Sequence, residues 1–293
     1  MKRLFKSKIP PDLSFRHTVE SHGWYDLAPF EYDATAKCLK YAMNLDNGQT
    51  AEIEFAEVNG KIFITADDNV DRIIAVGAFE LIFRLDEGFA EFYQILGDGT
   101  SIAWASEARA GRLLRSVTVW EDLVKTMCTT NCSWGLTKKM VGNLVENLGS
   151  ANDAGKKAFP TPEAMASVNV EFYREAVRAG YRSPYFMELA EAVAAGSIDP
   201  EVWLDSELPT VELKRELEGV KGIGDYAAEN MLKLLGRYDG LALDSWLRGG
   251  FYKKHNRGKV CPDKKIERHY ARYGDWRGLA IWCDMTKDWF EKE

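Results

Sequence analysis

The change in residue pattern near position 111 most constrains how this 293-residue chain can fold. Before that point, apolar and polar residues alternate in short runs separated by turn residues, whereas after it apolar residues recur at helical spacing. A run of strands followed by a run of helices is typical of the α+β class. We therefore predict an N-terminal domain over residues 1–110, built on an antiparallel sheet with helices, and an all-α domain over residues 111–293.

The strongest hairpin signal lies in the first domain. Residues 51–58 alternate between apolar and acidic side chains, and Asn59-Gly60 separates them from the apolar run 61–65. An Asn-Gly pair between two such runs favours a two-residue β-hairpin turn. We expect the acidic face of this sheet to lie in water, and we expect a helix within residues 68–85.

Helical spacing dominates the second domain. Thr161-Pro162 predicts a helix start, with the threonine as N-cap and the proline at the first helical position. Gly149 is expected to end the helix predicted over residues 137–148. Further helices are predicted over residues 120–130, 137–148, 186–195 and 211–217.

The composition excludes several protein classes. With 46% hydrophobic and 28% charged residues, the chain is of the ordinary globular kind and not disordered or fibrous. No apolar run approaches the roughly 20 residues needed to cross a bilayer, and no signal-peptide core follows the basic N-terminus. We expect a monomeric, intracellular protein without a membrane partner, in the cytoplasm or nucleoid, or in the nucleus of a eukaryote. The basic N-terminal residues could be a disordered arm or a targeting signal.

The charge of the chain is unevenly distributed. The formal net charge is −7, and residues 12–110 carry 18 acidic and 7 basic side chains. Residues 245–272 instead carry nine lysines and arginines against two acidic residues. That local excess of positive charge could face phosphates, or it could be a solvated helix surface.

Three closely spaced glycines, Gly219, Gly222 and Gly224, join two amphipathic helical segments. Glycine lets the backbone turn tightly and lets its N–H groups approach a ligand. The N-terminus of the second helix favours an anion because of the helix dipole. Such a turn can clamp a DNA phosphate without reading sequence, although it can also be a plain connection.

An aspartate flanked by apolar residues, Asp244, follows twenty residues after Gly224. Alone, it would be read as the N-cap of the next helix. Beside a phosphate clamp, a carboxylate can stabilise an oxocarbenium-like sugar and activate water, as in glycoside cleavage generally.

Together these features resemble the HhH-GPD superfamily of base-excision DNA glycosylases, in the branch that holds 8-oxoguanine and 3-methyladenine DNA glycosylases. Other matching segments occur in the family's order, and the resemblance covers about residues 111–290. It implies a small α/β domain followed by a helix-hairpin-helix glycosylase domain that binds double-stranded DNA containing a damaged base. The additional matching segments are residues 111–115, 124–134, 159–162, 180–182 and 274–280.

The resemblance also assigns roles to individual residues. Asp244 falls on the catalytic aspartate, and Asn131 falls on the residue that fills the gap left by a flipped base. Lys221 is expected at the phosphate, and Arg248 is expected to bind DNA. No cofactor is required, but in the family the hairpin holds a monovalent cation, Na or K, through backbone carbonyls. The hairpin positions are Gly219, Val220, Gly222 and Gly224.

Two departures from the family pattern are informative. Tyr226 stands where bifunctional members carry the lysine that forms a Schiff base with the sugar, and a phenol cannot form an imine. The resemblance therefore implies a monofunctional hydrolase. Ala242 stands where relatives usually have a proline, which we expect to loosen the loop slightly.

The base pocket is expected to be aromatic. A flipped base is held by stacking and by hydrogen bonds to its edge, although aromatic side chains in a helical domain can equally be core. Stacking and cation–π attraction would select electron-poor alkylated bases, while oxidised guanine would need polar groups that the sequence does not locate. The candidate pocket residues are Trp134, Tyr226, Trp246, Trp282 and Met285.

Two other functions fit the same motifs. One is a non-catalytic protein that binds damaged DNA with the same clamp, and the other is a bifunctional glycosylase/lyase that uses an unexpected lysine. The lesion, the preference for the opposite base and the organism stay open.

Overall fold

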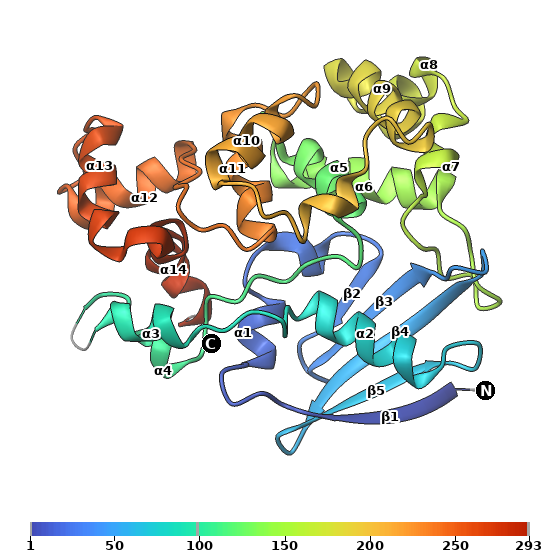
Figure 1. Cartoon of the computed structure of the whole chain (residues 1–293), viewed down its shortest axis with the longest axis horizontal. Helices are drawn as coiled ribbons and strands as arrows, with labels where there is room; N and C mark the ends of the chain where they lie inside the picture. Colours follow the sequence, from blue (N-terminus) through green and yellow to red (C-terminus); the bar gives the residue numbers. More distant parts are fainter. Residues whose placement is uncertain (1, 98–99, 292–293) are drawn as a thin grey trace.

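The computed structural model describes residues 2–97 and 100–291. Its first part is built on a five-stranded antiparallel sheet with strand order β1-β5-β4-β3-β2, and helices lie above and beside it (Figure 1). The α+β prediction is confirmed. The strands are β1 (Lys2–Lys8), β2 (Phe30–Asp33), β3 (Cys38–Asn44), β4 (Thr50–Val58) and β5 (Lys61–Asp67).

The predicted hairpin joins β4 to β5. Asn59 and Gly60 have φ angles of 50° and 70°, the left-handed conformation that a two-residue turn of this type requires. The predicted helix within residues 68–85 is α2 (Arg72–Ile82), and Asp71 caps it by accepting a hydrogen bond from the backbone N–H of Ile74.

The acidic face of the sheet is not fully in water. Glu52 is only 8% exposed, because the basic N-terminal segment forms the edge strand β1 and the ammonium group of Lys2 pairs with its carboxylate at 2.8 Å. The expectation of a solvated acidic face is therefore wrong at this residue. The N-terminal segment is an ordered strand and not a free arm.

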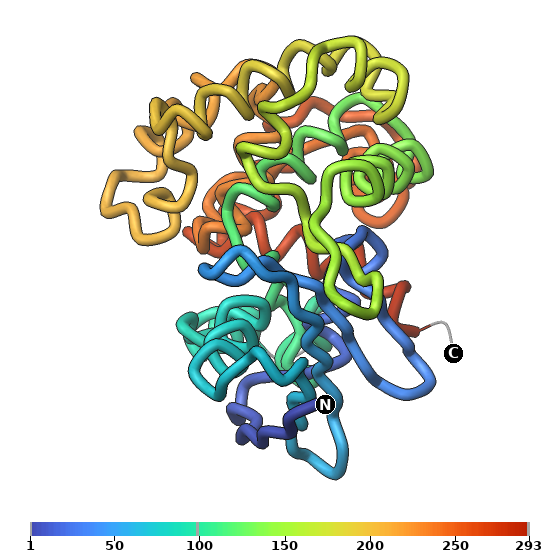
Figure 2. Tube along the Cα trace, turned by 90° about the vertical axis from the view of Figure 1, so that its right-hand side faces the viewer, coloured from blue at the N-terminus to red at the C-terminus, as the bar shows by residue number. Residues whose placement is uncertain are grey.

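Helices make up most of the remaining structure. Figure 2, turned by 90°, shows that the later helices form a separate layer above the sheet. Thr161 caps α7 and Pro162 is its first residue, as predicted. Besides α2, the helices are α1 (Phe15–Val19), α3 (Ala90–Leu96), α4 (Trp104–Glu107), α5 (Val119–Thr129), α6 (Trp134–Leu148), α7 (Pro162–Ala166), α8 (Val170–Phe172), α9 (Ser183–Ala194), α10 (Thr210–Glu218), α11 (Asp225–Leu234), α12 (Ser245–His255), α13 (Asp263–Tyr270) and α14 (Arg277–Phe290).

Helix α6 ends at Gly149, as predicted, but for a different reason from the expected left-handed cap. Its φ angle is −71°, which any residue can adopt. A Cβ atom at this position would overlap the carbonyl oxygen of Ala158, so glycine is needed for the close approach of two backbone segments.

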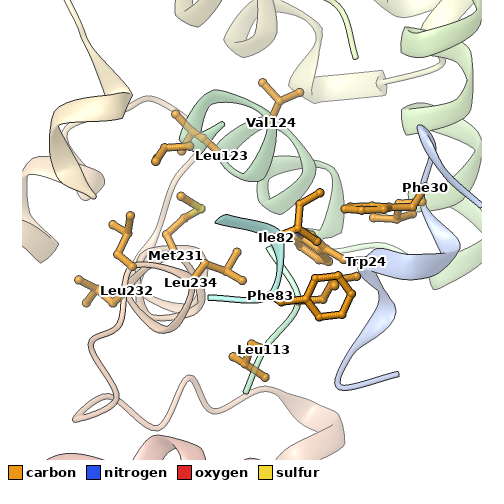
Figure 3. Close-up of a cluster of buried hydrophobic side chains, with 14 of the residues drawn as sticks. Trp24, Phe30, Ile82, Phe83, Leu113, Leu123, Val124, Met231, Leu232 and Leu234 are labelled. Atoms are coloured by element: carbon orange, nitrogen blue, oxygen red, sulfur yellow. The ribbon is translucent and has the colours of Figure 1, made fainter. Parts of the chain in front are cut away.

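One hydrophobic core runs through both predicted domains. Figure 3 shows Trp24 and Phe83 from the first part close to Leu113 and to side chains of α5 and α11. Buried polar contacts add to this interface: the hydroxyl of Tyr41 donates to Glu121 at 2.6 Å, and Trp24 donates to Asp122 at 2.7 Å. The two parts therefore pack as one body, and the boundary at residues 110–111 stays a prediction. Within residues 2–97 and 100–291, no helix is long and apolar enough to cross a membrane.

Candidate active site

A cavity of about 600 Å³ lies where the segment 22–25 of the first part meets the helical layer. Its size falls within the range of small-molecule sites in proteins. The walls come from the segment 22–25, the linker at Leu113, the α5–α6 region, α11, the start of α12, and α14.

Asp244 lies in the wall of this cavity and is half-buried. It is the N-cap of α12, where its Oδ1 atom accepts a hydrogen bond from the backbone N–H of Leu247 at 2.7 Å. The predicted place at a helix start is confirmed. The cap fixes one carboxylate oxygen, and the carboxylate also interacts with the phenol of Tyr226.

Two side chains of α11 hold the loop before Asp244. Glu229 accepts a hydrogen bond from the backbone N–H of Ala242, and the ammonium group of Lys233 donates to the carbonyl of Leu241 at 3.2 Å. Ala242 has a φ angle of 50°. Proline is locked near −65° and has no N–H to donate, so this loop could not accept it. The expectation that Ala242 loosens the loop is therefore wrong, because the peptide group between Leu241 and Ala242 is hydrogen-bonded at both its oxygen and its nitrogen.

Tyr226, the second residue of α11, lines the same cavity. Burial raises the pKa of its phenol to about 12, and the neighbouring carboxylate of Asp244 adds to the shift. The side chain is therefore a neutral phenol at physiological pH and contains no amine.

Tryptophans form much of the cavity wall. Trp246, Trp282 and Trp289 lie with ring centroids 5.5–5.8 Å apart. Trp134 also lines the cavity, and its indole N–H donates to Asp26 at 3.0 Å. A Cβ atom on Gly23 would overlap the ring of Trp134, so the glycine lets this ring approach the backbone closely.

Of the five predicted pocket residues, the structure gathers four around the cavity: Trp134, Tyr226, Trp246 and Trp282. Met285 is not among the lining residues. Its sulfur packs against α12, 2.6 Å from where a Cβ atom of Gly250 would stand. The pocket prediction for Met285 is therefore not borne out.

Sequence reasoning missed several lining residues, including Trp289, Lys233 and His22. Lys233 interrupts an otherwise apolar run on α11, and that interruption was a readable signal. His22 comes from the first part of the chain and carried no such signal. Burial lowers the pKa of its imidazole to about 3, so the ring is neutral. Its Nε2 atom is buried and has no hydrogen-bond partner within the described part of the chain.

The glycine turn joins α10 to α11, as predicted. Gly222 has a φ angle of 92°, and a Cβ atom there would lie 2.9 Å from the ring of Tyr185. Gly224 is the N-cap of α11 and faces open space. The first backbone N–H groups of α11 therefore point out of an uncrowded helix end. Lys221 is 68% exposed in its side chain and pairs with Glu188 at 2.5 Å.

Asn131 lies between α5 and α6 and is exposed. Its φ angle of 46° is the left-handed conformation, which asparagine adopts more readily than most residues. Its side-chain amide donates to the hydroxyl of Tyr181 at 3.3 Å. The guanidinium of Arg248 forms two hydrogen bonds of 2.8 Å to Asp263 and donates to the carbonyl of Leu243. Arg248 therefore braces the residue before Asp244, and its DNA-binding role stays a prediction.

No protein-family model and no curated protein matches the chain by sequence. Solved structures match it by shape. MBOgg1 in complex with a low-affinity DNA ligand has a TM-score of 0.78 at 19% identity, over 99% of this chain and 96% of that one.

Two further structures give the same result. The 3-methyladenine DNA glycosylase of Archaeoglobus fulgidus has a TM-score of 0.76 at 19% identity, over 98% of this chain and 99% of that one. An 8-oxoguanine glycosylase/lyase of Clostridium acetobutylicum, in complex with double-stranded DNA, has a TM-score of 0.66 at 17% identity, over 84% and 88%. The chain therefore has the fold of the 8-oxoguanine and 3-methyladenine DNA glycosylases.

Proposed function

We propose that the protein is a base-excision DNA glycosylase, which removes a damaged base from double-stranded DNA by hydrolysing its N-glycosidic bond. The observation that carries this proposal is the position of Asp244 in the wall of an aromatic cavity of about 600 Å³. A glycine turn that leads into the exposed N-terminus of α11 adds a phosphate site close by in the fold. The DNA glycosylase fold supports the same conclusion.

In this mechanism the damaged nucleotide leaves the stack at a cost of a few kcal/mol, and its base enters the cavity between the tryptophans. The sugar stays near Asp244, which lies at the cavity wall and is half-buried. As the glycosidic bond breaks, positive charge develops on the sugar, and the carboxylate stabilises it and orients the attacking water. Asn131 fills the vacated stack, and the N-terminus of α11 holds a phosphate.

Tyr226 supports a monofunctional hydrolase. A lyase of this kind needs a neutral primary amine beside the sugar, and Tyr226 offers a phenol whose pKa is raised by burial. We expect the wild-type protein to leave an intact abasic strand that is cut only after alkali. Borohydride should trap no covalent complex with abasic DNA.

A second candidate, the bifunctional glycosylase/lyase, is favoured by one specific observation. Lys233 lines the same cavity, and burial lowers the pKa of its amine to about 8. A fraction of this amine is neutral at pH 7, as imine formation requires. A complex trapped by borohydride with the wild-type protein, and lost in Lys233→Met, would establish the lyase and overturn the monofunctional proposal.

We also propose that the hairpin carbonyls of Gly219, Gly222 and Gly224 hold a monovalent cation, with that of Gly224 shared, because it already accepts the backbone N–H of Ala228 at 2.9 Å. Neutral carbonyl oxygens are suitable ligands for a hard cation of single charge. The cation would supply positive charge next to a DNA phosphate. Duplex affinity should be higher in Na or K chloride than in tetramethylammonium chloride of the same ionic strength, and equal affinities would contradict the site.

The decisive experiment for the proposed function is a release assay on duplexes that each carry one lesion. Release of a free base by the wild-type protein and not by Asp244→Asn would support the glycosylase. Binding to a damaged duplex without release of any base would support the non-catalytic alternative instead.

A further inference from the structure

Lys233 has the most unusual environment of the side chains that line the cavity. It lies on α11 among apolar neighbours and is only 2% exposed. An ammonium group has three donors. Within the described residues, one of them is used, by the carbonyl of Leu241. A buried ammonium group with donors to spare, in the wall of a cavity, can serve a ligand that enters the cavity.

The surrounding carboxylates leave the ammonium group of Lys233 available to a ligand in the cavity. The nearest carboxylates that act on it are Glu229 and Asp244. Glu229 is already engaged, because it pairs with Lys214 at 2.9 Å and accepts the backbone N–H of Ala242. The carboxylate of Asp244 is half-buried and caps α12, whereas Lys233 is almost fully buried. The positive charge therefore lies deeper in the cavity than the catalytic negative charge.

The aromatic wall would act differently without this lysine. Indole faces attract cations, so a cavity of tryptophans alone would favour a positively charged base. Here the ammonium group of Lys233 already lies over the face of Trp282, 6.0 Å from the ring centroid. A cationic base that stacks in the same cavity would meet a like charge in a medium of low dielectric constant, where repulsion is strong.

We propose that Lys233 determines specificity by admitting uncharged bases that present a carbonyl oxygen or ring nitrogen as acceptor, and by excluding cationic N-alkylated bases. This inference rests on the proposed glycosylase function. The neutral imidazole of His22 supports it, because its buried and unpartnered Nε2 atom supplies a second polar contact in the same cavity. A base with polar edges could satisfy both groups, whereas a purely aromatic fit would leave the Nε2 atom of His22 unpaired and the remaining donors of Lys233 unused.

The test compares release of 8-oxoguanine and hypoxanthine, which are uncharged, with release of 3-methyladenine, which is cationic in DNA. The rate of spontaneous base loss from each duplex is subtracted from the measured release rate. The wild-type protein should release the better uncharged base at least about tenfold faster than 3-methyladenine. Lys233→Met removes the charge while keeping the length of the side chain. It should lower the ratio of the release rate of the uncharged base to that of 3-methyladenine about tenfold or more. Lys233→Arg should keep the wild-type ratio.

A matched control is Lys287→Met. Lys287 lies on α14, which carries Trp282, but it is not among the cavity-lining residues and pairs with Glu291 at 3.3 Å. This variant should keep the wild-type ratio. A shift equal to that of Lys233→Met would show that the effect is one of general charge or stability and would overturn the proposal.

The pH dependence of the release ratio provides a second test, in which the wild-type protein is compared with Lys233→Met and Cys132→Ser. Raising the pH from 7 to 9 passes the pKa of Lys233, about 8, and neutralises the amine, so the ratio should move toward the cationic base. His22 stays neutral in this window and so does Tyr226, because their pKa values are about 3 and about 12. The thiol of Cys132 also lines the cavity, and the same shift in Cys132→Ser assigns the effect to Lys233. Lys233→Met should show no such shift.

The possible outcomes distinguish failure of the specificity proposal from failure of the proposed glycosylase function. If the wild-type protein releases both kinds of base at similar rates, or if Lys233→Met leaves the ratio unchanged, the specificity proposal is refuted and the glycosylase function stands. If the wild-type protein releases no base from any duplex, the proposed function fails and the specificity proposal fails with it. If Lys233→Met does not fold, Lys233→Gln, which also removes the charge, takes its place in both comparisons.

Discussion

Replacing Asp244 by asparagine is the sharpest test of the catalytic site, because the structure allows the charge to be removed without removing the helix cap. The Oδ1 atom of Asp244 accepts the N–H of Leu247 at 2.7 Å, and an asparagine oxygen can do the same. Asparagine and aspartate are about equally good N-caps. The loss of charge at the helix N-terminus costs about 0.3–1 kcal/mol of stability, which a folded protein of this size tolerates.

The expected effect on excision is far larger than the effect on stability. Loss of one strong electrostatic stabiliser of a transition state costs about 2.7–4 kcal/mol, or about 10²–10³-fold in rate. The neighbours of Asp244 provide an independent check of its charge. Its carboxylate contributes to the raised pKa of Tyr226 and opposes the lowering of the pKa of Lys233. Both pKa values should therefore fall in Asp244→Asn.

The assay is single-turnover release of the base, combined with duplex binding and thermal unfolding. Asp71→Asn is the matched control, since Asp71 caps α2 through the N–H of Ile74 and lies outside the cavity. It makes the same chemical change in the same kind of cap, and it should leave excision unchanged. A folded Asp244→Asn protein that excises at a near-normal rate would refute the mechanism.

Three further substitutions test the rest of the site. Gly224→Ala places a methyl group in open space, so it should keep the fold and weaken binding to duplexes of any sequence. Gly222→Ala should also lower the unfolding temperature, because Gly222 has a φ angle of 92°. A loss of affinity that depends on the duplex sequence would contradict the phosphate clamp. Asn131→Ala should reduce excision from stable pairs about tenfold more than from mismatched pairs, because only the former pay the full cost of flipping; equal losses would indicate a purely structural residue. Gly23→Ala should displace the ring of Trp134 and slow release of the base. Duplex affinity, measured by fluorescence titration, should stay the same. An unchanged release rate would show that this wall does not contact the base.

Much of the fold was predictable because its signals are local. The Asn59-Gly60 turn, the Thr161 cap and the glycine turn between α10 and α11 each depend on a few adjacent residues, and all three were confirmed. Strand β1 was missed because Lys2–Lys8 is a basic run with little apolar alternation. It becomes a strand only by pairing with the edge of β5, a contact between residues some 60 positions apart.

Helix α14 carried a signal in its spacing that would have added Trp289 to the predicted Trp282. Trp282 and Trp289 are seven residues apart on α14 and share one face, which lines the cavity. Met285 lies three residues after Trp282 and four before Trp289 on the same side of the helix, but its sulfur packs against Gly250 of α12, a difference that spacing and residue type could not detect. His22 and Gly23 reach the cavity only through tertiary packing, which no local pattern encodes.

The contribution of residues 22–25 to the cavity has a consequence for how such a chain can diverge. These residues shape one wall, while the glycine turn, the tether of the Leu241–Ala242 loop and Asp244 are all encoded more than 190 positions later. Substitutions in this short early segment can therefore reshape the wall that a base would touch while leaving the machinery for bond cleavage intact. If the proposed function holds, a change at residues 22–25 would alter which base fits the cavity, and Asp244 and the loop that holds it would keep their sequence.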